Sequence, residues 1–278
     1  MKIKQYKGCR LSKFRTLNTA DFYVEVANET DITNAFLLAK ERDLKTFVLG
    51  AGSNVFFKNA KVKSALIKNN LPKEIKHIDR DLFEVSSSVD MLQLLNFAFE
   101  QRRDCCYYLA SAPCQVGGAI VMNAGSGKKE AKYICNFIKS VKFFDGKRIV
   151  EKKKEDIFFD YRTSEFRREE CFVISAIFEF PKKNITINPI RERLEWAKKN
   201  QDLSQANCGS MCNTYNANIL KFVRFLFAPL PCGLSKKKLN WAQNKSKNPF
   251  WLKLMFGTIK ALHKILHKRL KFEIIFVD

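Results

Sequence analysis

Glycine residues gather in two short segments of this chain, and segments of this kind can hold the phosphate groups of a ligand. Of the 11 glycines, six lie in residues 50–54 and 116–127. Glycine lets the backbone adopt a positive φ and approach a ligand closely. Successive N–H groups in such turns form a concavity that binds anionic oxygens. The two segments therefore predict an extended, phosphate-bearing ligand that is held from two sides.

The first glycine segment does not have the spacing of a common nucleotide-binding motif. Gly50-Ala51-Gly52 is followed by Ser53 and Asn54, without the third glycine of a G-x-G-x-x-G motif and without the Gly-Lys-Ser/Thr of a P-loop. Each segment, taken alone, also fits a tight turn after a strand. Ser53 and Asn54 favour a polar ligand at the first segment, and both interpretations stay open at this point.

Length and cysteine content limit the classes of protein. A chain of 278 residues forms one large domain or two ordinary ones, and 46% hydrophobic residues suffice for a packed core. Nine cysteines without a C-x-x-C motif, and a charged start without a signal peptide, predict reduced thiols in a cytoplasmic protein. Cys208 and Cys212 have no matching second pair, so no metal site is expected. No apolar run reaches the roughly 18 residues of a transmembrane helix.

The chain is strongly basic. It carries 50 lysine and arginine residues against 28 acidic ones, a formal net charge of +22. Such a charge permits binding to nucleic acid, to an anionic membrane or to an acidic small molecule. The lysines are spread along the whole chain, which favours a general basic bias over a dedicated nucleic-acid surface. We therefore expect no dedicated nucleic-acid partner.

Strand and helix patterns are mixed along the first 180 residues and predict an α+β fold. Helical spacing occupies residues 31–42 and 91–100, the latter with Leu92, Leu95 and Ala98 facing inward. Strand patterns occupy residues 46–49, 64–67, 82–85 and 171–180, and Asp145-Gly146 between two apolar runs predicts a hairpin. A helix follows over residues 190–200, and residues 181–278 hold 19 basic residues against five acidic ones. This change predicts two domains, residues 1–182 and 183–278.

Three motifs in this order carry a resemblance to a known family. They are Val48-Leu49-Gly50-Ala51-Gly52-Ser53-Asn54, then Leu109-Ala110-Ser111-Ala112-Pro113 leading into Val116-Gly117-Gly118-Ala119 and Met122-Asn123-Ala124-Gly125, and Phe159-Asp160-Tyr161-Arg162-Thr163-Ser164-Glu165-Phe166. With them the chain resembles the UDP-N-acetylenolpyruvoylglucosamine reductase family over nearly its full length. The resemblance implies a two-subdomain FAD-binding domain of the PCMH, or vanillyl-alcohol-oxidase-like, type over residues 1–182. It also implies a smaller α+β substrate-binding domain over residues 183–278, in the branch without a long tyrosine-bearing loop.

The same resemblance implies which residues bind the cofactor and the substrate. The FAD contacts fall on Gly50, Ala51, Gly52, Ser53, Asn54, Pro113, Val116, Gly117, Gly118, Asn123, Ala124 and Gly125, and the substrate contacts on Tyr161, Asn213 and Asn240. The active-site arginine of the family falls on Arg162, its proton-donating serine on Ser210, and its glutamate in the last strand on Glu273.

The reaction that the resemblance implies is an NADPH-dependent reduction. The enolpyruvyl ether of UDP-N-acetylglucosamine enolpyruvate becomes the lactyl ether of UDP-N-acetylmuramate, a step of peptidoglycan synthesis that serves cell-wall formation, cell shape and cell division. Arg162 would hold the substrate carboxylate in its planar fork, and Ser210 would protonate the carbanionic carbon. Glu273 would position hydrogen bonds at that centre. The expected partner is thus a UDP-sugar, and the protein is expected to be a cytoplasmic monomer.

Departures from the family pattern concentrate in the C-terminal half. Cys114-Gln115 stands where the family usually has Gly-Thr, and an unusual Met211-Cys212-Asn213-Thr214-Tyr215 follows Ser210. The usual Ser-Glu-Lys-His-x-Asn-Phe reads Ser235-Lys236-Lys237-Lys238-Leu239-Asn240-Trp241. These departures leave open that the chain is a catalytically degenerate FAD-binding homologue.

A basic amphipathic stretch over residues 250–270 supports an alternative of a different class. Met255, Ile259, Leu262 and Leu266 share one face, and His263 and His267 are assigned to the solvated basic face. Such a helix can lie on an anionic membrane, although a helix docked on its own domain is the commoner case. The alternative is therefore a basic protein that binds nucleic acid or an anionic membrane.

Overall fold

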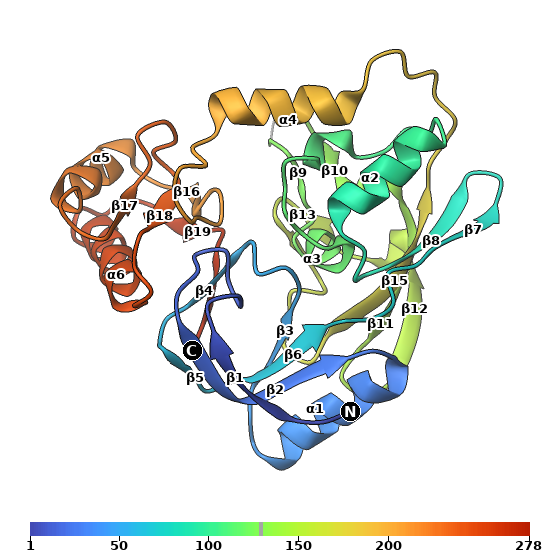
Figure 1. Cartoon of the computed structure of the whole chain (residues 1–278), viewed down its shortest axis with the longest axis horizontal. Helices are drawn as coiled ribbons and strands as arrows, with labels where there is room; N and C mark the ends of the chain where they lie inside the picture. The colour runs from blue at the N-terminus through green and yellow to red at the C-terminus, as the bar shows by residue number, and fades with distance from the viewer. Residues whose placement is uncertain (128–129) are drawn as a thin grey trace. The chain divides into compact units, whose positions relative to one another are not determined.

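The chain divides into two compact units in a computed structural model that describes residues 1–127 and 130–278 (Figure 1). Unit 1 consists of Met1–Ile3, Tyr23–Gly50 and Ala65–Ala197. Unit 2 consists of Lys4–Phe22, Ala51–Ser64 and Lys198–Asp278. Each unit thus combines segments that are distant in the sequence, and the predicted domains 1–182 and 183–278 stay a prediction.

Unit 1 is built on a five-stranded antiparallel sheet with the strand order β12-β11-β15-β8-β7. The predicted hairpin is confirmed as β11 and β12, and the carboxylate of Asp145 accepts from the backbone N–H groups of Lys147 (2.8 Å) and Arg148 (2.9 Å) in its turn. These bonds lower the pKa of Asp145 below its usual value. The strands are β7 (Ile75–Asp79), β8 (Leu82–Ser86), β11 (Ile138–Phe144), β12 (Ile149–Lys153) and β15 (Phe172–Glu179).

Helices of unit 1 bury the residues that their spacing brings to one side. In α2 (Met91–Glu100), the buried residues Met91, Leu94, Leu95 and Ala98 recur at the i, i+3, i+4, i+7 spacing of one helix face. In α1 (Glu29–Glu41), Asn28 caps the first turn by accepting from the Asp31 N–H at 2.8 Å. The short α3 (Val116–Val121) packs on β8 and β15, and α4 (Pro189–Asn200) ends the unit and runs three residues into unit 2.

The remaining strands of unit 1 are short or parallel. The end of β2 (Asn18–Val26) pairs in parallel with β6 (Ala65–Asn69), which pairs in parallel with β3 (Thr46–Leu49). Two small hairpins join β9 (Gly125–Ser126) to β10 (Lys132–Tyr133) and β13 (Phe159–Asp160) to β14 (Thr163–Ser164). Three 3₁₀ turns complete the unit: η1 (Tyr107–Leu109), η2 (Ile134–Phe137) and η3 (Lys154–Asp156).

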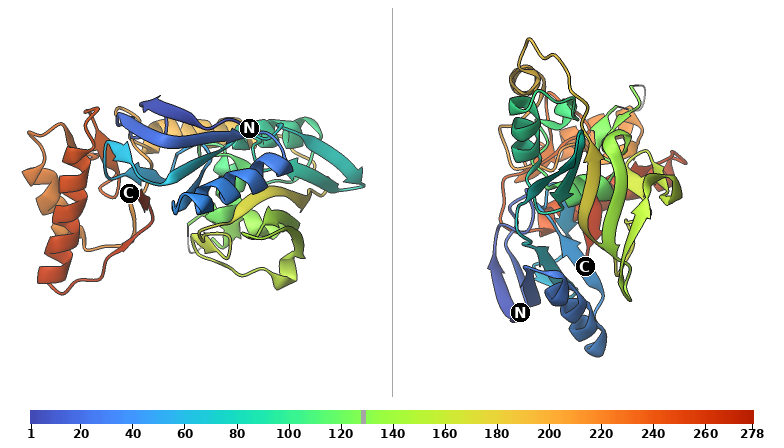
Figure 2. Two further views of the ribbon diagram at one scale, coloured as in Figure 1. Left: turned by 90° about the horizontal axis from the view of Figure 1, so that it is seen from below. Right: turned by 90° about the vertical axis from the view of Figure 1, so that its right-hand side faces the viewer.

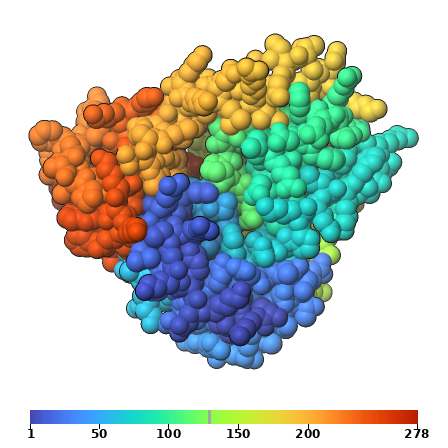
Figure 3. Space-filling model, in the orientation of Figure 1, coloured from blue at the N-terminus to red at the C-terminus, as the bar shows by residue number. Residues whose placement is uncertain are grey.

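Unit 2 encloses its own core, which brings N-terminal and C-terminal residues together. Asn244 Nδ2 donates to the Phe14 carbonyl (2.7 Å), and Leu17 N–H donates to the Lys247 carbonyl (2.6 Å). In Figure 3, N-terminal residues (blue) therefore lie beside C-terminal residues (orange and red). The parallel pair of β20 (Ile275–Val277) with β4 (Val55–Phe57) ties the end of the chain to the segment after the first glycine turn.

Two helices dominate the C-terminal part of unit 2. α5 (Ala217–Leu226) and α6 (Phe250–Ile265) lie side by side (Figure 2) and share the core with Met211 and Phe56. The strands of the unit are β1 (Lys4–Gly8), the first half of β2, β4, β5 (Lys61–Val62), β16 (Cys212–Thr214), β17 (Cys232–Leu234), β18 (Ala242–Asn244), β19 (Lys271–Phe272) and β20.

Two expectations from helical spacing are wrong. Leu92 is exposed, because it lies one position off the buried face of α2 that begins at Met91. His263 is buried rather than solvated: its Nε2 accepts from the Asn216 N–H (3.0 Å) and its Nδ1 donates to the Ile259 carbonyl (2.7 Å). His263 therefore joins α6 to the first turn of α5. His267, which follows α6, is exposed as expected.

Candidate active site

The first glycine segment forms a turn whose backbone N–H groups are available to an anion. Gly52 has φ +67°, and a Cβ at this position would overlap the carbonyl oxygen of Leu11. The Gly52 carbonyl accepts from the Lys13 N–H at 2.9 Å. Within the described part of the chain, no backbone N–H of residues 51–54 donates a hydrogen bond. Such a run of N–H groups is the kind of concavity that holds phosphate oxygens.

The segment that carries Ser210 lies beside this turn, in the same unit. The Sγ atom of Cys208 is 3.7 Å from the Gly52 carbonyl and 3.6 Å from the Val55 carbonyl. Burial raises the pKa of the Cys208 thiol to about 11, so the thiol is neutral and donates weakly to these oxygens. Gly209 follows with φ +73°, and this turn places the partly exposed Ser210 just beyond the buried thiol.

The strand that carries Glu273 completes this group. The Met211 carbonyl accepts from the Glu273 N–H at 2.8 Å, so the residue after Ser210 is bonded to the backbone of Glu273. The Asn54 side chain donates to the Glu273 carbonyl at 3.2 Å, which joins the glycine turn to the same strand. Unit 2 therefore brings together the first glycine turn, Ser210 and Glu273. Asn54, a predicted cofactor contact, uses its amide nitrogen for this link.

Asn240, a predicted substrate contact, uses its carboxamide to hold the backbone after Ser210. Its Oδ1 accepts from the Cys212 N–H (3.0 Å), and its Nδ2 donates to the Cys212 carbonyl (2.7 Å). Its own carbonyl accepts from the Met211 N–H (2.9 Å), and the neighbouring Trp241 forms a β-bridge with Ser210. These bonds fix the Ser210 segment on both sides of its buried Met211.

A buried polar network supports the loop that contains Asn240. Ser235 is fully buried, and its hydroxyl donates to the Asp202 carboxylate at 2.7 Å. The same oxygen accepts from the N–H groups of Lys237 (3.1 Å) and Lys238 (2.9 Å). Hydrogen bonds from the side chain of Ser204, which has the larger effect, and from that of Ser235 lower the pKa of Asp202 to about 2. The loop that departs from the family pattern is thus held by a carboxylate that no sequence motif identified.

The side-chain oxygen of Asn213 has no hydrogen-bond partner among the described residues. Its Oδ1 is buried, and no donor in residues 1–127 or 130–278 reaches it. A buried acceptor without a partner is costly, and a polar ligand that donates a hydrogen bond could satisfy it. Asn213 follows Ser210 by three residues in unit 2, which fits its predicted place among the substrate contacts.

In unit 1, the second glycine segment forms a helix rather than a turn. The N–H groups of Val116 and Gly117 donate to the carbonyls of Val89 (2.9 Å) and Ser87 (2.8 Å), and that of Ala119 to Gln115 (3.0 Å). A Cβ at Gly117 would lie 2.8 Å from the Ser87 Cβ, so glycine is needed there for packing. At the exposed Gly118, by contrast, a Cβ would meet no described atom within 4 Å. Gly118 is therefore the glycine of α3 that faces open space.

Gln115 presents a second buried acceptor without a partner, beside Gly50 of the same unit. Its side-chain Oε1 is buried, receives no hydrogen bond from the described residues and lies 3.3 Å from the position of a Cβ at Gly50. The sequence marks this residue as a departure from Gly-Thr but does not place it in the site. The structure adds Gln115 to the residues that could bind the cofactor, because an orphaned acceptor at this place suits a ligand donor.

Arg162 lies on a tight turn that is fastened to α3. The turn joins β13 and β14, and Arg162 has φ +57°. Asn123 donates to the Asp160 carbonyl at 3.1 Å, and the Ser164 hydroxyl donates to the Val121 carbonyl at 2.8 Å. The guanidinium carbon of Arg162 stands 5.5 Å from the ring centre of Tyr161, a cation–π distance. Unit 1 thus brings Arg162 and Tyr161 to the second glycine segment.

The other predicted contacts of unit 1 differ in their surroundings. Pro113 is exposed ahead of α3, and the Ala124 N–H donates to the Ala119 carbonyl at 2.8 Å. Gly125 pairs with Tyr133 across β9 and β10, and a Cβ there would overlap the Lys132 carbonyl. Asn123 accepts from the Cys135 N–H (3.4 Å) in addition to its bond to Asp160. Asn123 and Gly125 therefore shape the segment, whether or not they also touch a ligand.

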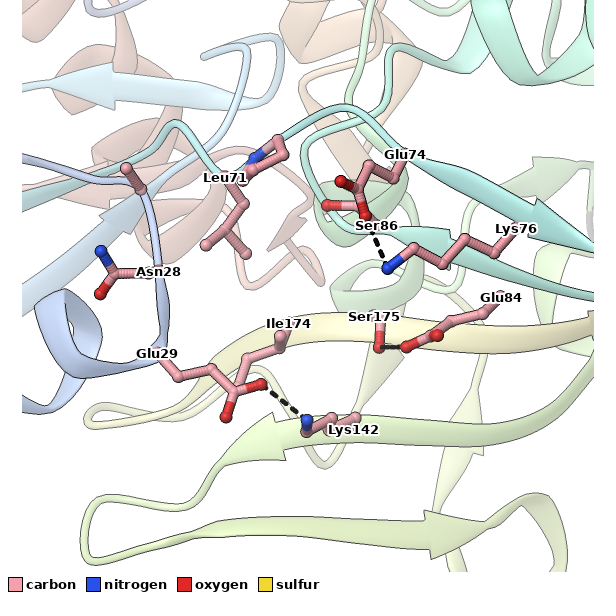
Figure 4. A pocket seen from close by; sticks show the side chains of 12 residues that line it. Asn28, Glu29, Leu71, Glu74, Lys76, Glu84, Ser86, Lys142, Ile174 and Ser175 are labelled. Atoms are coloured by element: carbon pink, nitrogen blue, oxygen red, sulfur yellow. Dashed lines mark hydrogen bonds and ion pairs between the residues drawn. The ribbon is translucent and has the colours of Figure 1, made fainter.

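One shallow pocket of unit 1 lies apart from these residues. It encloses about 280 Å³, and none of the predicted site residues lines it (Figure 4). Its charged groups satisfy one another: Lys142 pairs with Glu29 (2.6 Å), Lys76 pairs with Glu74 (2.8 Å), and Ser175 donates to Glu84 (2.8 Å). Both lysines are thus paired with carboxylates and Glu84 adds a negative charge, so this pocket has no unpaired positive charge to recognise a phosphate.

Metal ligands and membrane spans are not found in the part of the chain that the structure describes. No group of three or more His, Cys, Asp or Glu residues is placed there to hold a metal ion. No helix among these residues is both long and apolar enough to cross a membrane. All nine cysteines are free thiols.

Comparison with known proteins gives consistent matches. Residues 20–149 match the family described as FAD binding domain. The UDP-N-acetylenolpyruvoylglucosamine reductase of Aquifex aeolicus is 32% identical over 180 residues, which are 64% of this chain and 59% of that protein. The reductase of the same name from Fusobacterium nucleatum is 25% identical over 270 residues, 95% of this chain and 89% of its relative. The chain thus spans about three fifths of the Aquifex protein and most of the Fusobacterium one.

A solved structure supports the same assignment at the level of the fold. The crystal structure of UDP-N-acetylenolpyruvylglucosamine reductase from Thermus caldophilus matches over the full length of both chains, with a TM-score of 0.74 at 16% identity. The predicted α+β fold with an FAD-binding domain is confirmed by this match and by residues 20–149. In sequence and in fold, the chain is thus similar to UDP-N-acetylenolpyruvoylglucosamine reductases, and part of it matches an FAD binding domain.

Proposed function

We propose that this protein is an FAD-dependent reductase that converts UDP-N-acetylglucosamine enolpyruvate to UDP-N-acetylmuramate with NADPH. The observation that carries the proposal is the grouping in unit 2 of the first glycine turn, Ser210 and Glu273 through the bonds of Asn54 and Met211. A phosphate-binding turn beside a proton donor and a carboxylate is what a flavin reductase of this kind requires. The proposed product serves peptidoglycan synthesis, in the cytoplasm, and the protein acts as a monomer.

Several features of the chain fit FAD. The unengaged N–H groups of residues 51–54 suit the pyrophosphate, and the open side of Gly118 admits a cofactor close to the backbone. The orphaned Oε1 of Gln115 suits a hydroxyl or N–H donor of the flavin or its ribityl chain. The bound flavin supplies a hydride for the terminal alkene carbon of the substrate and takes it up from NADPH.

The protein residues supply the charge and the proton. Arg162 holds the substrate carboxylate with two parallel hydrogen bonds and stabilises the enolate-like charge that develops on it. Ser210 Oγ donates its proton to the carbon beside that carboxylate. A serine hydroxyl is a weak acid, so it serves only against a strongly basic carbon. Glu273 accepts hydrogen bonds at the same centre, and Asn213 Oδ1 accepts one from the substrate.

The test separates the two halves of the reaction. Purified protein should show oxidised-flavin absorbance that NADPH bleaches without oxygen. In stopped flow, Ser210→Ala should slow reoxidation by the enolpyruvyl substrate by at least about 100-fold, the low end for general acid catalysis. Flavin reduction by NADPH should barely change, and Ser210→Cys should recover part of the lost rate because a thiol is the better acid.

A control serine distinguishes loss of the proton donor from general damage. Ser246→Ala changes a serine of unit 2 whose hydroxyl caps the Asn248 N–H, far along the chain from Ser210. It should leave both half-reactions intact. A flavin-loaded parent protein without turnover would identify a degenerate homologue, and a Ser210→Ala variant with near-native turnover would exclude the assigned proton donor.

A further inference from the structure

Helix α5 exposes a second apolar side that the core of unit 2 does not use. Its core side consists of Ile219, Leu220 and Val223, all buried. On the other side, Phe222, Phe225 and Leu226 are 53%, 79% and 47% exposed. Residues at i, i+3 and i+4 are neighbours on a helix surface, so these three side chains form one patch. Adjacent large apolar residues at the surface mark an interaction site, unlike exposed residues scattered singly.

The charge around this patch is of one sign. Residues 198–278 carry 15 lysine and arginine residues against three acidic ones, Asp202, Glu273 and Asp278. Asp202 is buried in the Ser235 network, and Asp278 pairs with Lys58. Neither α5 nor α6 contains an acidic residue, while α5 carries Lys221 and Arg224 next to the patch. The surface that complements this region is therefore anionic.

Helix α6 also carries both basic and apolar side chains on its exposed side. Lys253, Lys260 and Lys264 are exposed at a spacing of seven and four residues, which places them in one row. Beside this row, Phe250 (53%), Leu254 (43%) and Ile265 (69%) are exposed. The Asn216–His263 hydrogen bond and the shared core hold α5 and α6 together (Figure 2). Both helices of this packed pair thus expose basic and apolar side chains.

We propose that this helix pair docks unit 2 on the surface of an anionic phospholipid bilayer. Phe222, Phe225 and Leu226 enter the interface between headgroups and acyl chains, and the lysines of α5 and α6 bind the headgroup phosphates. Aliphatic Leu226 beside the two phenylalanines favours acyl chains over nucleic acid, because a leucine has no aromatic face on which a base could stack. Docking is peripheral and reversible, since one short patch inserts only a few side chains.

Vesicle sedimentation tests the lipid charge and the patch together. The flavin-loaded full chain should sediment with vesicles that contain phosphatidylglycerol and stay in solution with pure phosphatidylcholine. The double variant Phe222→Ser/Phe225→Ser should bind the anionic vesicles at least about tenfold more weakly, because most of the inserted apolar surface is gone. Phe158→Ser, which changes a residue of unit 1 that is 61% exposed, should bind like the parent. Lys221→Gln/Arg224→Gln should weaken binding most at low salt, where screening is least.

A spectroscopic variant distinguishes insertion from electrostatic attraction alone. Phe225→Trp should gain fluorescence that shifts to the blue on anionic vesicles and is quenched by lipids brominated on their acyl chains. Phe158→Trp should show neither change. Equal binding by Phe222→Ser/Phe225→Ser and the parent, no quenching of Phe225→Trp, or equal binding to neutral vesicles would overturn the proposal. A parent that elutes as a dimer, with Phe222→Ser/Phe225→Ser a monomer, would assign the patch to a second copy instead.

Discussion

Asn240 forms two hydrogen bonds with the backbone of Cys212, one through each polar atom of its carboxamide, at 3.0 and 2.7 Å. It acts on the backbone two residues beyond Ser210, so its effect on a reaction at Ser210 is one of positioning. The side chain of Asn213 differs in this respect, because its Oδ1 is buried and has no hydrogen-bond partner among the described residues. The two asparagines should therefore respond to the same substitution in different ways.

Asn240→Ala should lower stability and activity together. Loss of two hydrogen bonds and exposure of the Cys212 backbone groups should cost about 1–3 kcal/mol in the free energy of unfolding. Asn213→Ala should leave the free energy of unfolding unchanged or higher and raise the KM for the enolpyruvyl substrate. Chemical denaturation and steady-state kinetics of both variants check this, and equal destabilisation by both would contradict the assignment.

Gly118 should be a cleaner probe of cofactor binding than Gly52. In Gly118→Val a side chain enters open space, so the apoprotein should stay folded while FAD affinity falls at least about tenfold through steric exclusion. Gly52→Ala should destabilise the apoprotein itself, because its φ of +67° is strained for alanine and its Cβ overlaps the Leu11 carbonyl.

Thermal unfolding of the apoproteins and flavin occupancy from visible absorbance separate these two effects. An apoprotein of Gly118→Val that unfolds at a lower temperature, with full flavin occupancy after reconstitution, would show that Gly118 does not face the cofactor.

Gln115→Leu should separate binding from stability. The Oε1 atom of Gln115 is buried without a partner, so its replacement by an apolar group should leave the apoprotein as stable or more stable. If this oxygen accepts a hydrogen bond from the flavin, FAD affinity should fall about five- to tenfold, the worth of one hydrogen bond. Fluorescence titration of the apoprotein with FAD measures the affinity. Unchanged affinity would remove Gln115 from the cofactor site.

Asp202 should make the loop of Asn240 sensitive to acid. Its pKa is lowered to about 2 by the hydroxyls of Ser204 and Ser235, whereas an unfolded aspartate titrates near 3.9. A depressed folded-state pKa contributes stability that is complete above about pH 4 and is lost as the pH falls through about 2. Asp202→Asn should thus be less stable than the parent at neutral pH, with the difference shrinking toward pH 2. Thermal unfolding across this range checks the trend, and a difference independent of pH would refute it.

The sequence by itself determined the local features, because their causes lie within a few residues. The Asp145-Gly146 hairpin, the helix over residues 91–100 and the glycine turn at residues 50–54 are confirmed. Turn chemistry needs only the glycine and the aspartate of the turn itself, and helical burial repeats with the helix period. The ordered motifs also indicated the resemblance to the reductases that the comparisons report, because such motifs depend on the residues of a site and not on how the chain folds around it.

Tertiary structure decided which polar groups serve the fold and which remain for a ligand. The second glycine segment is a helix because the distant carbonyls of Ser87 and Val89 accept its first N–H groups. The side chain of Asn240 bonds to the backbone of Cys212, whereas the side-chain oxygens of Asn213 and Gln115 have no partner among the described residues. The three residues all carry an amide side chain, so the sequence does not reveal this difference. His263 is buried on α6, where its Nε2 accepts from the N–H of Asn216, the N-cap residue of α5. Hydrogen-bond partners far apart in the chain meet only when the chain is folded, so local periodicity carries no record of them.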